Sequence, residues 1–318
     1  MSTRNERGQA MVLTVIFLVV LLGMSAMVLD VGSWYRADRD TQSTADAAAL
    51  AGAQALPEDP AKAVQLAQQY ANKNGGLGGG KILISSDIVS NDTISVTVQR
   101  TAPTFFAKVV GLQSVGVGSK GVARADGVSS VRYVAPIVVH YKHPYLNCTG
   151  PSSHPTCKPT LPSPSTTLTL SDMHQSGGGS GAGAFGLINL NYNDPSGNIG
   201  AGTLADWLLK GYDGDLPTGK YYSAPSANFN NSQFTSALDQ LIKSGTEVLF
   251  PVYRLLTGPG SNAQYDIIGW VGFVITSYKV NGSSSTITGY FTSYTANGVQ
   301  VTTGGNPYFG VKTVQLVG

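Results

Sequence analysis

The sequence predicts an α+β protein in which an N-terminal transmembrane helix continues into a long helix, followed by a small α/β unit and a β-rich domain with inserted helices. Three observations lead to this fold class. Residues 10–29 are almost entirely apolar, and a proline-free, Ala-rich stretch continues from them to about residue 56. Beyond it, most apolar runs alternate with polar residues, a period typical of strands.

Residues 10–29 predict a membrane-spanning helix. A helix of about 20 residues rises about 30 Å, the thickness of a hydrocarbon core. The two polar residues of the span, Thr14 and Ser25, can bond to the helix's own carbonyls. Trp34 and Tyr35 follow where interfacial aromatic residues are expected. The span is longer than the apolar core of a signal peptide, and charged residues replace a small-x-small cleavage site, so we expect an uncleaved anchor.

Charge indicates the orientation of this anchor. Arg4 and Arg7 precede the span, whereas the charges that directly follow it balance. The positive-inside rule therefore places the tail, residues 1–9, in the cytoplasm and the rest of a single-pass cell-membrane protein outside. Charged residues make up only 12% of the chain, and its net charge is +2. Because the basic residues are scattered, we expect no nucleic-acid partner.

The outer part of the long helix carries small residues at four-residue spacing. Ala45, Ala49 and Ala53 form one row, and Gly52 lies on the neighbouring row. Such rows let another backbone approach closely, although alanine is also the best helix former. We expect these four residues to form a partner-docking face, which also suits a helix-mediated oligomer.

Residues 30–126 are predicted to complete the small unit. Apolar residues at helical spacing, prolines near helix starts and alternating runs assign its elements. In order after the long helix, these are a helix from Pro60, a hairpin of residues 81–90 and 92–100, a short amphipathic helix over 101–112 and a strand over 114–125.

Residues 127–318 are predicted to form the β-rich extracytoplasmic domain, whose role the sequence does not assign. Two helices with apolar residues at helical spacing interrupt its strands. The predicted helices cover 202–212 and 228–245, and the predicted strands cover 131–140, 166–173, 186–192, 247–256, 265–280, 285–295 and 298–303.

A Pro-rich loop of this domain contains both cysteines of the chain, Cys148 and Cys157. An extracytoplasmic location favours a disulfide, which would stabilise the fold by about 2–3 kcal/mol. His140, His143 and His154 lie around the same loop, so a tetrahedral zinc site and free thiols remain as alternatives.

Catalytic signatures are missing from the sequence. It contains no GxSxG or HExxH motif and no paired carboxylates in a convincing setting. We therefore expect neither an enzyme nor a cofactor. A hydrolase remains an alternative, since catalytic triads are assembled by folding and not by sequence order.

Specific motifs surround the apolar span. RGQA at 7–10 precedes it, and LDVGSWY at 29–35, Arg39, Gln42 and ADAAALA at 45–51 follow it. In this order the motifs resemble the N-terminal segment of TadE/TadG-like proteins, which belong to the Flp (tight adherence) pilus-assembly systems of bacteria. The resemblance covers about residues 7–56.

The resemblance implies a membrane-anchored, extracytoplasmic structural or accessory component of a Flp pilus system. Such a pseudopilin-like protein would carry residues 30–126 as a pilin-like unit, with the cytoplasmic membrane and other pilus-assembly or pseudopilin proteins as partners. Type IV prepilins are cut after a Gly that precedes a Glu by five residues. Counted from the candidate Gly8, that position is Leu13, so we expect no cleavage. The alternative is a surface-exposed binding or hydrolytic protein that uses the helix only as an anchor.

Overall fold

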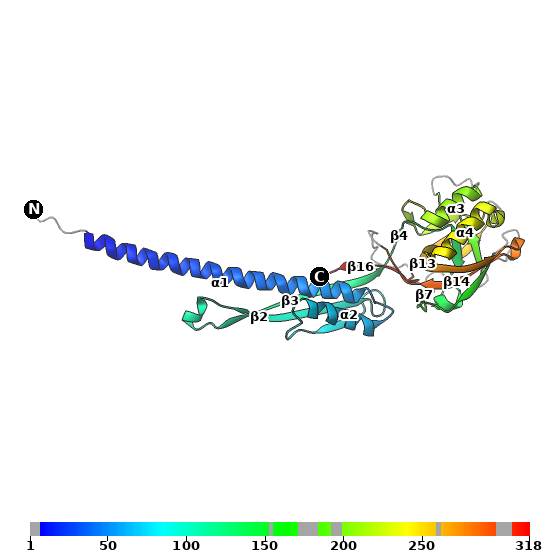
Figure 1. Cartoon of the computed structure of the whole chain (residues 1–318). Coiled ribbons are helices and arrows are strands. Elements are labelled where there is room, and N and C mark those ends of the chain that lie inside the picture. The colour runs from blue at the N-terminus through cyan, green and yellow to red at the C-terminus, as the bar shows by residue number, and fades with distance from the viewer. Residues whose placement is uncertain (1–6, 153–154, 171–183, 192–198, 259–261, 297–306) are drawn as a thin grey trace, which may run out of the picture. The chain divides into compact units, whose positions relative to one another are not determined.

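The computed structural model describes residues 7–152, 155–170, 184–191, 199–258, 262–296 and 307–318 (Figure 1). It confirms the predicted α+β class, with a long N-terminal apolar helix followed by β-sheets and inserted helices. The chain divides into two compact units. The first comprises Met1–Ala125 together with Val314–Gly318, and the second comprises Asp126–Thr313.

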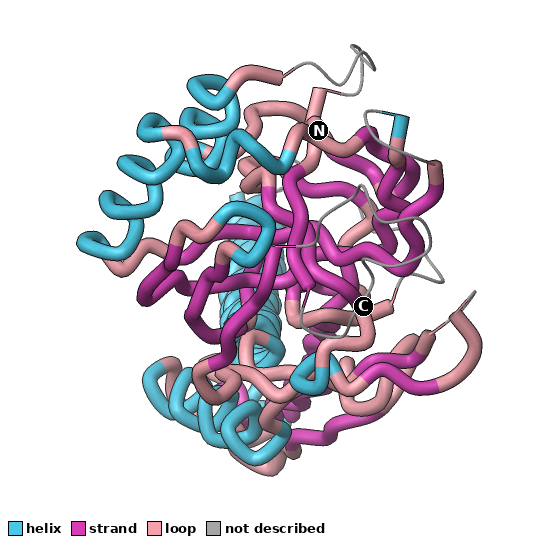
Figure 2. The backbone as a smooth tube through the Cα atoms, turned by 90° about the vertical axis from the view of Figure 1, so that its right-hand side faces the viewer, coloured by secondary structure: helices cyan, strands magenta, loops and turns pink. Residues whose placement is uncertain are grey.

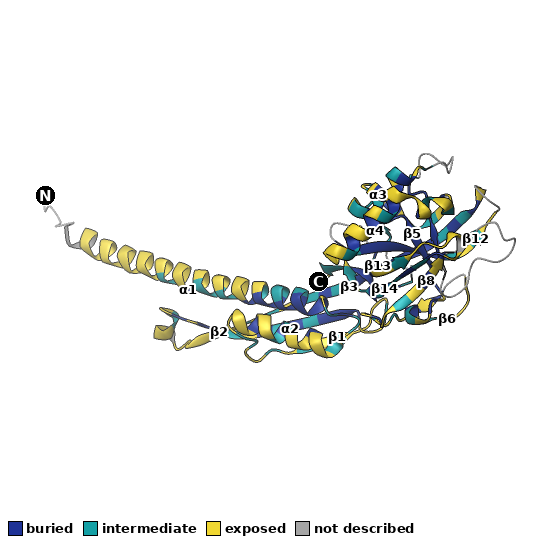
Figure 3. Cartoon of the chain, turned by 45° about the vertical axis from the view of Figure 1, so that its right-hand side comes forward, coloured by how far each residue is buried: buried dark blue, intermediate teal, exposed yellow. Residues whose placement is uncertain are grey.

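Helix α1, Arg7–Ala53, is one continuous element of 47 residues. Its first part is exposed and apolar, and its last part is buried (Figure 3). The hydroxyls of Thr14 and Ser25 donate to the carbonyls of Ala10 and Leu21, each at 2.9 Å, so neither needs a partner from outside the helix. Among the described residues, α1 is the helix long and apolar enough to cross a membrane, consistent with a single-pass anchor.

The buried part of α1 packs against α2, Pro60–Lys73, because both helices present alanines at close spacing. Asp59 caps the start of α2 by accepting from the Lys62 amide at 2.9 Å, with Pro60 in the first turn. The facing residues are Ala45, Ala48, Ala49 and Ala53 of α1 and Ala63, Ala67 and Ala71 of α2, all fully buried.

A β-sheet completes the core of the first unit. Its strands are β1, Ile82–Ser85, β2, Thr93–Pro103, and β3, Ser114–Gly127, and they pair antiparallel. Alternate residues of β2, namely Ile94, Val96 and Val98, face the two helices. In Figure 1, β2 and β3 run beside α1, and the tip that joins them points toward the N-terminal end of the helix.

The last residues of the chain return to this sheet, a pairing that the sequence did not predict. Strand β16, Val311–Leu316, lies next to β3. The Val317 amide donates to the Val122 carbonyl at 2.9 Å. Residues 314–318 thus belong to the first unit, although the sequence-based division assigned them to the 127–318 domain.

The helix predicted over 101–112 is wrong. Strand β2 extends through Pro103, and only the short 3₁₀ helix η1, Ala107–Val110, follows it. The amides of Phe105, Phe106 and Ala107 bond to the carboxylate of Asp30, so this segment begins as a loop held by another element.

Seven strands form the main sheet of the second unit. They are β5, Ile137–His140, β8, Thr166–Leu170, β9, Ala184–Leu187, β11, Gly219–Tyr222, β12, Glu247–Thr257, β13, Gln264–Lys279, and β14, Thr286–Thr292. Their order is β11-β13-β12-β5-β9-β8-β14, and β14 also pairs with β13. Six of these strands therefore close into a ring, which leaves β11 attached to β13.

Two helices, α3, Ala201–Lys210, and α4, Ser232–Ser244, lie together on one side of these strands (Figure 2). Their inward residues, including Leu204, Leu208, Phe234 and Leu238, pack with Phe250 of β12 and Phe273 of β13. The smaller elements are β4, Ser130–Val131, η2, Pro144–Leu146, β6, Cys148–Thr149, β7, Thr156–Cys157, β10, Leu216–Pro217, η3, Ser226–Asn230, η5, Gly282–Ser284, and β15, Tyr294–Thr295.

Candidate functional site

The buried carboxylate of Asp30 joins the helix to the tip of the β2–β3 hairpin. Asp30 is 2% exposed, whereas its neighbours Leu29 and Val31 are 57% and 50% exposed. Oδ1 of Asp30 accepts from the amide of Phe105 at 2.6 Å, and Oδ2 accepts from that of Ala107 at 2.6 Å. The Phe106 amide lies 3.1 Å from Oδ2 and 3.2 Å from Oδ1. We call this arrangement of Asp30 with Phe105–Ala107 the Asp30 junction.

Local sequence explains why three amides are available to one side chain. Pro103 ends β2, the amides of Phe105 and Phe106 precede the 3₁₀ helix and that of Ala107 begins it, so none of the three has a carbonyl partner within that helix. The single proton of the Thr104 hydroxyl is shared between the carbonyls of Leu112 (2.6 Å) and Gln113 (2.9 Å), a contact that closes the base of the loop. A carboxylate is the acceptor best suited to such a group of amides.

The electrostatic environment keeps Asp30 ionised. Burial would raise the pKa of this carboxyl, but hydrogen bonds from the amides of Phe105, Ala107 and Phe106 lower it, and the charge of Lys108 adds to them. The net result is a pKa of Asp30 below its ordinary value. The junction is therefore complete at neutral pH.

The junction lies directly beyond the apolar part of α1. Ser33, one turn further along, has its hydroxyl 2.8 Å from the Asp30 carbonyl and 3.4 Å from the Pro103 carbonyl. A groove of about 540 Å³ runs here between α1 and the hairpin, lined among others by Leu29, Ser33 and Phe105. The Asp30 junction therefore holds the hairpin tip next to the end of the apolar span.

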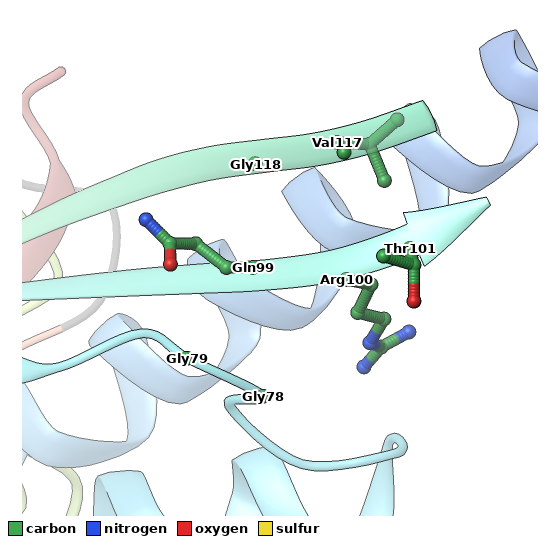
Figure 4. Close-up of a pocket in the computed structure, with 8 residues that line it drawn as sticks. Gly78, Gly79, Gln99, Arg100, Thr101, Val117 and Gly118 are labelled. Carbon is green, nitrogen blue, oxygen red and sulfur yellow. The ribbon is translucent and has the colours of Figure 1, made fainter. Parts of the chain in front are cut away.

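A second, larger depression of about 810 Å³ lies over β2 and β3 and the Gly78–Gly79 loop (Figure 4). Its one charged lining residue among those described is Arg100. The Arg100 guanidinium donates to the carbonyls of Asn74 and Gly76 at 2.5 and 3.2 Å and so holds this loop in place.

The small-residue face predicted for partner docking is covered by the chain itself. Ala45, Ala49 and Ala53 are fully buried against α2 and the sheet. A side chain at Gly52 would place its Cβ 2.6 Å from Cδ1 of Ile94 and 2.9 Å from the Ala63 carbonyl. The spacing of these residues therefore serves close packing inside the first unit.

Cys148 and Cys157 form a disulfide between β6 and β7. Both sulfur ligands considered for zinc, Cys148 and Cys157, are thus bonded to each other. His154 lies outside the described residues, and no group of three metal-ligating side chains occurs within the described ranges.

The two described histidines of this region are buried. His140 packs against the ring of Tyr253, with centroids 5.1 Å apart. Nδ1 of His143 accepts from the Tyr145 amide at 3.3 Å, and its Nε2 lies 3.2 Å from the Thr166 hydroxyl. Burial lowers the pKa of both rings, that of His143 to about 4. Both therefore serve as neutral packing groups.

Gly8 is the second residue of α1, and cleavage after it was not expected from the sequence; whether it occurs stays a prediction.

The site residue that could not be recognised from the sequence is Asp30, because in the sequence it looks like any charged residue that flanks an apolar span. The available signal was its position, since it is the first carboxylate after the apolar span and lies within the LDVG motif.

Comparison with curated proteins and with solved structures finds no match to this chain. A family model described as "Putative Flp pilus-assembly TadE/G-like" matches residues 8–55. The matched range comprises nearly all of α1, including Asp30 and the buried alanine face. The N-terminal segment of the chain, residues 8–55, is thus similar to TadE/G-like Flp pilus-assembly proteins.

Proposed function

We propose that this protein is a membrane-anchored, extracytoplasmic structural or accessory component of a Flp/Tad-type pilus-assembly system, acting in the manner of a pseudopilin and not as an enzyme. One observation carries the proposal. The continuous helix α1 has an exposed apolar part of bilayer length and a buried part that forms the core of the first unit.

Continuity of α1 has a mechanical consequence. A flexible linker would let an anchored domain move freely, whereas an uninterrupted helix transmits the direction of the span to the unit packed on it. The Asp30 junction adds a second connection at the point where the span ends. Such a protein would present its folded unit at a fixed height and angle, which suits assembly beside other membrane helices.

The orientation in this proposal follows the positive-inside rule. The short tail with Arg4 and Arg7 lies in the cytoplasm, and the chain beyond the apolar span, which includes the whole second unit, lies outside. The disulfide of the second unit supports this orientation, because disulfides persist in oxidising compartments outside the cytoplasm. Partners are the cytoplasmic membrane and other pilus-assembly or pseudopilin proteins.

Complementation in a bacterium whose own copy of this chain has been deleted tests the proposal. Deletion is expected to abolish surface pili, and the full chain is expected to restore them. A matched variant lacking residues 1–29 and exported by a cleaved signal should fail to restore pili, because its units are no longer anchored. Normal piliation without the chain would contradict the proposal and favour a protein that uses α1 only as an anchor.

A further inference from the structure

We propose that the tip of the β2–β3 hairpin, residues 104–113, is a second membrane contact that inserts into the outer interface of the phospholipid bilayer beside α1. The inference rests on the anchoring role of α1 in the proposed function. It adds an interaction surface that the family match, which ends at residue 55, does not include.

The tip exposes an unusual amount of apolar side chain. Phe105, Phe106, Val109 and Leu112 are 61%, 47%, 88% and 42% exposed. These four residues lie within a stretch of eight, whereas strands β1, β2 and β3 contain one large apolar residue of comparable exposure, Leu83. A clustered patch of this kind marks a contact surface.

The Asp30 junction places this patch at the level where the membrane ends. The Phe105 amide is 2.6 Å from the carboxylate of Asp30, and Asp30 directly follows the apolar span. Figure 1 shows the hairpin running back along α1, so that its tip is the part of the β1–β3 sheet nearest the span. The lipid that surrounds the apolar span of α1 therefore also reaches the patch, and it is the partner that we propose for it.

Most of the backbone amides that could face lipid at the tip are hydrogen-bonded within the protein. A segment that enters lipid must pair its own amides and carbonyls. Three amides bond to Asp30, and those of Val109, Gly111 and Leu112 donate to carbonyls within the tip at 3.0–3.1 Å. The Thr104 hydroxyl shares its one proton between two carbonyls at the base. This pairing meets one requirement for entry into lipid.

The chemistry of the side chains matches the boundary between acyl chains and headgroups. Phenylalanine rings with valine and leucine suit the upper acyl region, and the exposed Lys108 can reach the phosphates. Arg36 of α1, also exposed, lies on the groove beside the tip and adds positive charge near the headgroups. A bilayer contact fits this convex loop better than a protein helix, which would need a groove of complementary shape.

Spin-label depth measurements on the full chain in phosphatidylcholine/phosphatidylglycerol vesicles test this inference. A thiol label attaches only to an introduced cysteine, because Cys148 and Cys157 are bonded to each other. The test site is Val109→Cys, and the matched control is Ile88→Cys, which is also exposed but lies beyond the opposite end of β2. About ten strand residues, or roughly 30 Å, separate these ends. Val19→Cys reports on the span itself.

The expected result is a several-fold higher ratio of oxygen to nickel-chelate collisions at Val109→Cys than at Ile88→Cys. Equal, water-like ratios at both sites would overturn the inference. So would a label at Val109→Cys that is shielded from both reagents, since that outcome means another protein copy covers the tip. A water-like ratio at Val19→Cys would instead contradict the anchor, and with it the proposed function.

Discussion

The carboxylate of Asp30 and the backbone amide of Phe105 meet at 2.6 Å although 75 positions separate them in the chain. This bond connects the end of the apolar span to the far tip of a hairpin. It links the apolar helix to the sheet that completes the core of the first unit.

Replacing Asp30 with alanine removes the acceptor for three amides. Hydrogen bonds to a charged group are among the stronger ones in proteins, and the freed amides then exchange by local opening. Hydrogen exchange of residues 105–107, measured by mass spectrometry on the full chain, is expected to rise by roughly tenfold or more. The control is Asp40→Ala, an exposed carboxylate on the same helix. Unchanged exchange in Asp30→Ala would show that the junction does not hold the tip.

Two glycines allow the close packing of α1, and substituting either should destabilise the first unit. A Cβ at Gly121 would lie 2.6 Å from the Ala45 carbonyl carbon, and one at Gly52 would lie 2.9 Å from the Ala63 oxygen. Because backbone obstructs both positions, Gly121→Ala and Gly52→Ala should each cost about 1–3 kcal/mol in urea unfolding.

The matched control for these substitutions is Gly32→Ala on the same helix. No atom lies within 4 Å of a Cβ at Gly32, and alanine favours helix, so this variant should stabilise by up to about 1 kcal/mol. Equal effects at Gly32 and Gly121 would contradict the packing described here.

The turn between β1 and β2 depends on Asp92. Its buried carboxylate accepts from the amides of Asp87, Ile88 and Val89 at 2.7–2.8 Å. Asp92→Ala should therefore cost on the order of 2 kcal/mol in unfolding free energy. Asp87→Ala, which removes only an exposed carboxylate paired with Arg124, should cost less than about 1 kcal/mol. If both variants unfolded at the same urea concentration, Asp92 would not organise the turn.

Mild acid should destabilise the second unit through His143. Its pKa is about 4 in the fold against 6.5 ordinarily, so as pH falls the unfolded chain takes up the proton first. The stabilising contribution is full above pH 6.5 and is lost as pH falls through about 4. Between pH 7 and 5 the loss is about 1–2 kcal/mol, a window in which most carboxylates stay ionised.

The measurement for this prediction is urea unfolding followed by tryptophan fluorescence, to which Trp207 and Trp270 of the second unit contribute. His143→Gln should weaken the pH dependence, and the remainder should reflect His140, whose pKa is also lowered. An unchanged pH dependence in His143→Gln would contradict the buried neutral ring.

Long, strongly patterned elements could be predicted from the sequence. The apolar and Ala-rich run determines α1 because helix length and composition are local properties. The four-residue spacing of Ala45, Ala49 and Ala53 is typical of a face that packs closely. It could not indicate the partner, because α2 and a distant sheet reach that face only after folding.

Tertiary contacts explain what the sequence did not show. The pattern of residues 101–112 suits an amphipathic helix. Instead, the carboxylate of Asp30 on α1 accepts hydrogen bonds from the amides of Phe105 and Ala107, and the apolar side chains of the segment stay exposed. Likewise β16 pairs with β3 from the opposite end of the chain, and nothing local identifies such a partner. Asp30 belongs to the same class, since its role depends on a segment 75 residues away.

Thiol labelling from outside the cell tests the central claim, that α1 crosses the membrane once and emerges at Asp30. Single cysteines would replace residues along α1 from Leu22 to Asp40 in the full chain, and a membrane-impermeant maleimide would be added outside. We predict protection of positions before 30 and labelling of exposed positions after it, such as Arg36→Cys and Asp40→Cys. Labelling of Leu22→Cys, or labelling of Arg36→Cys only after the cytoplasmic side is opened, would contradict the account.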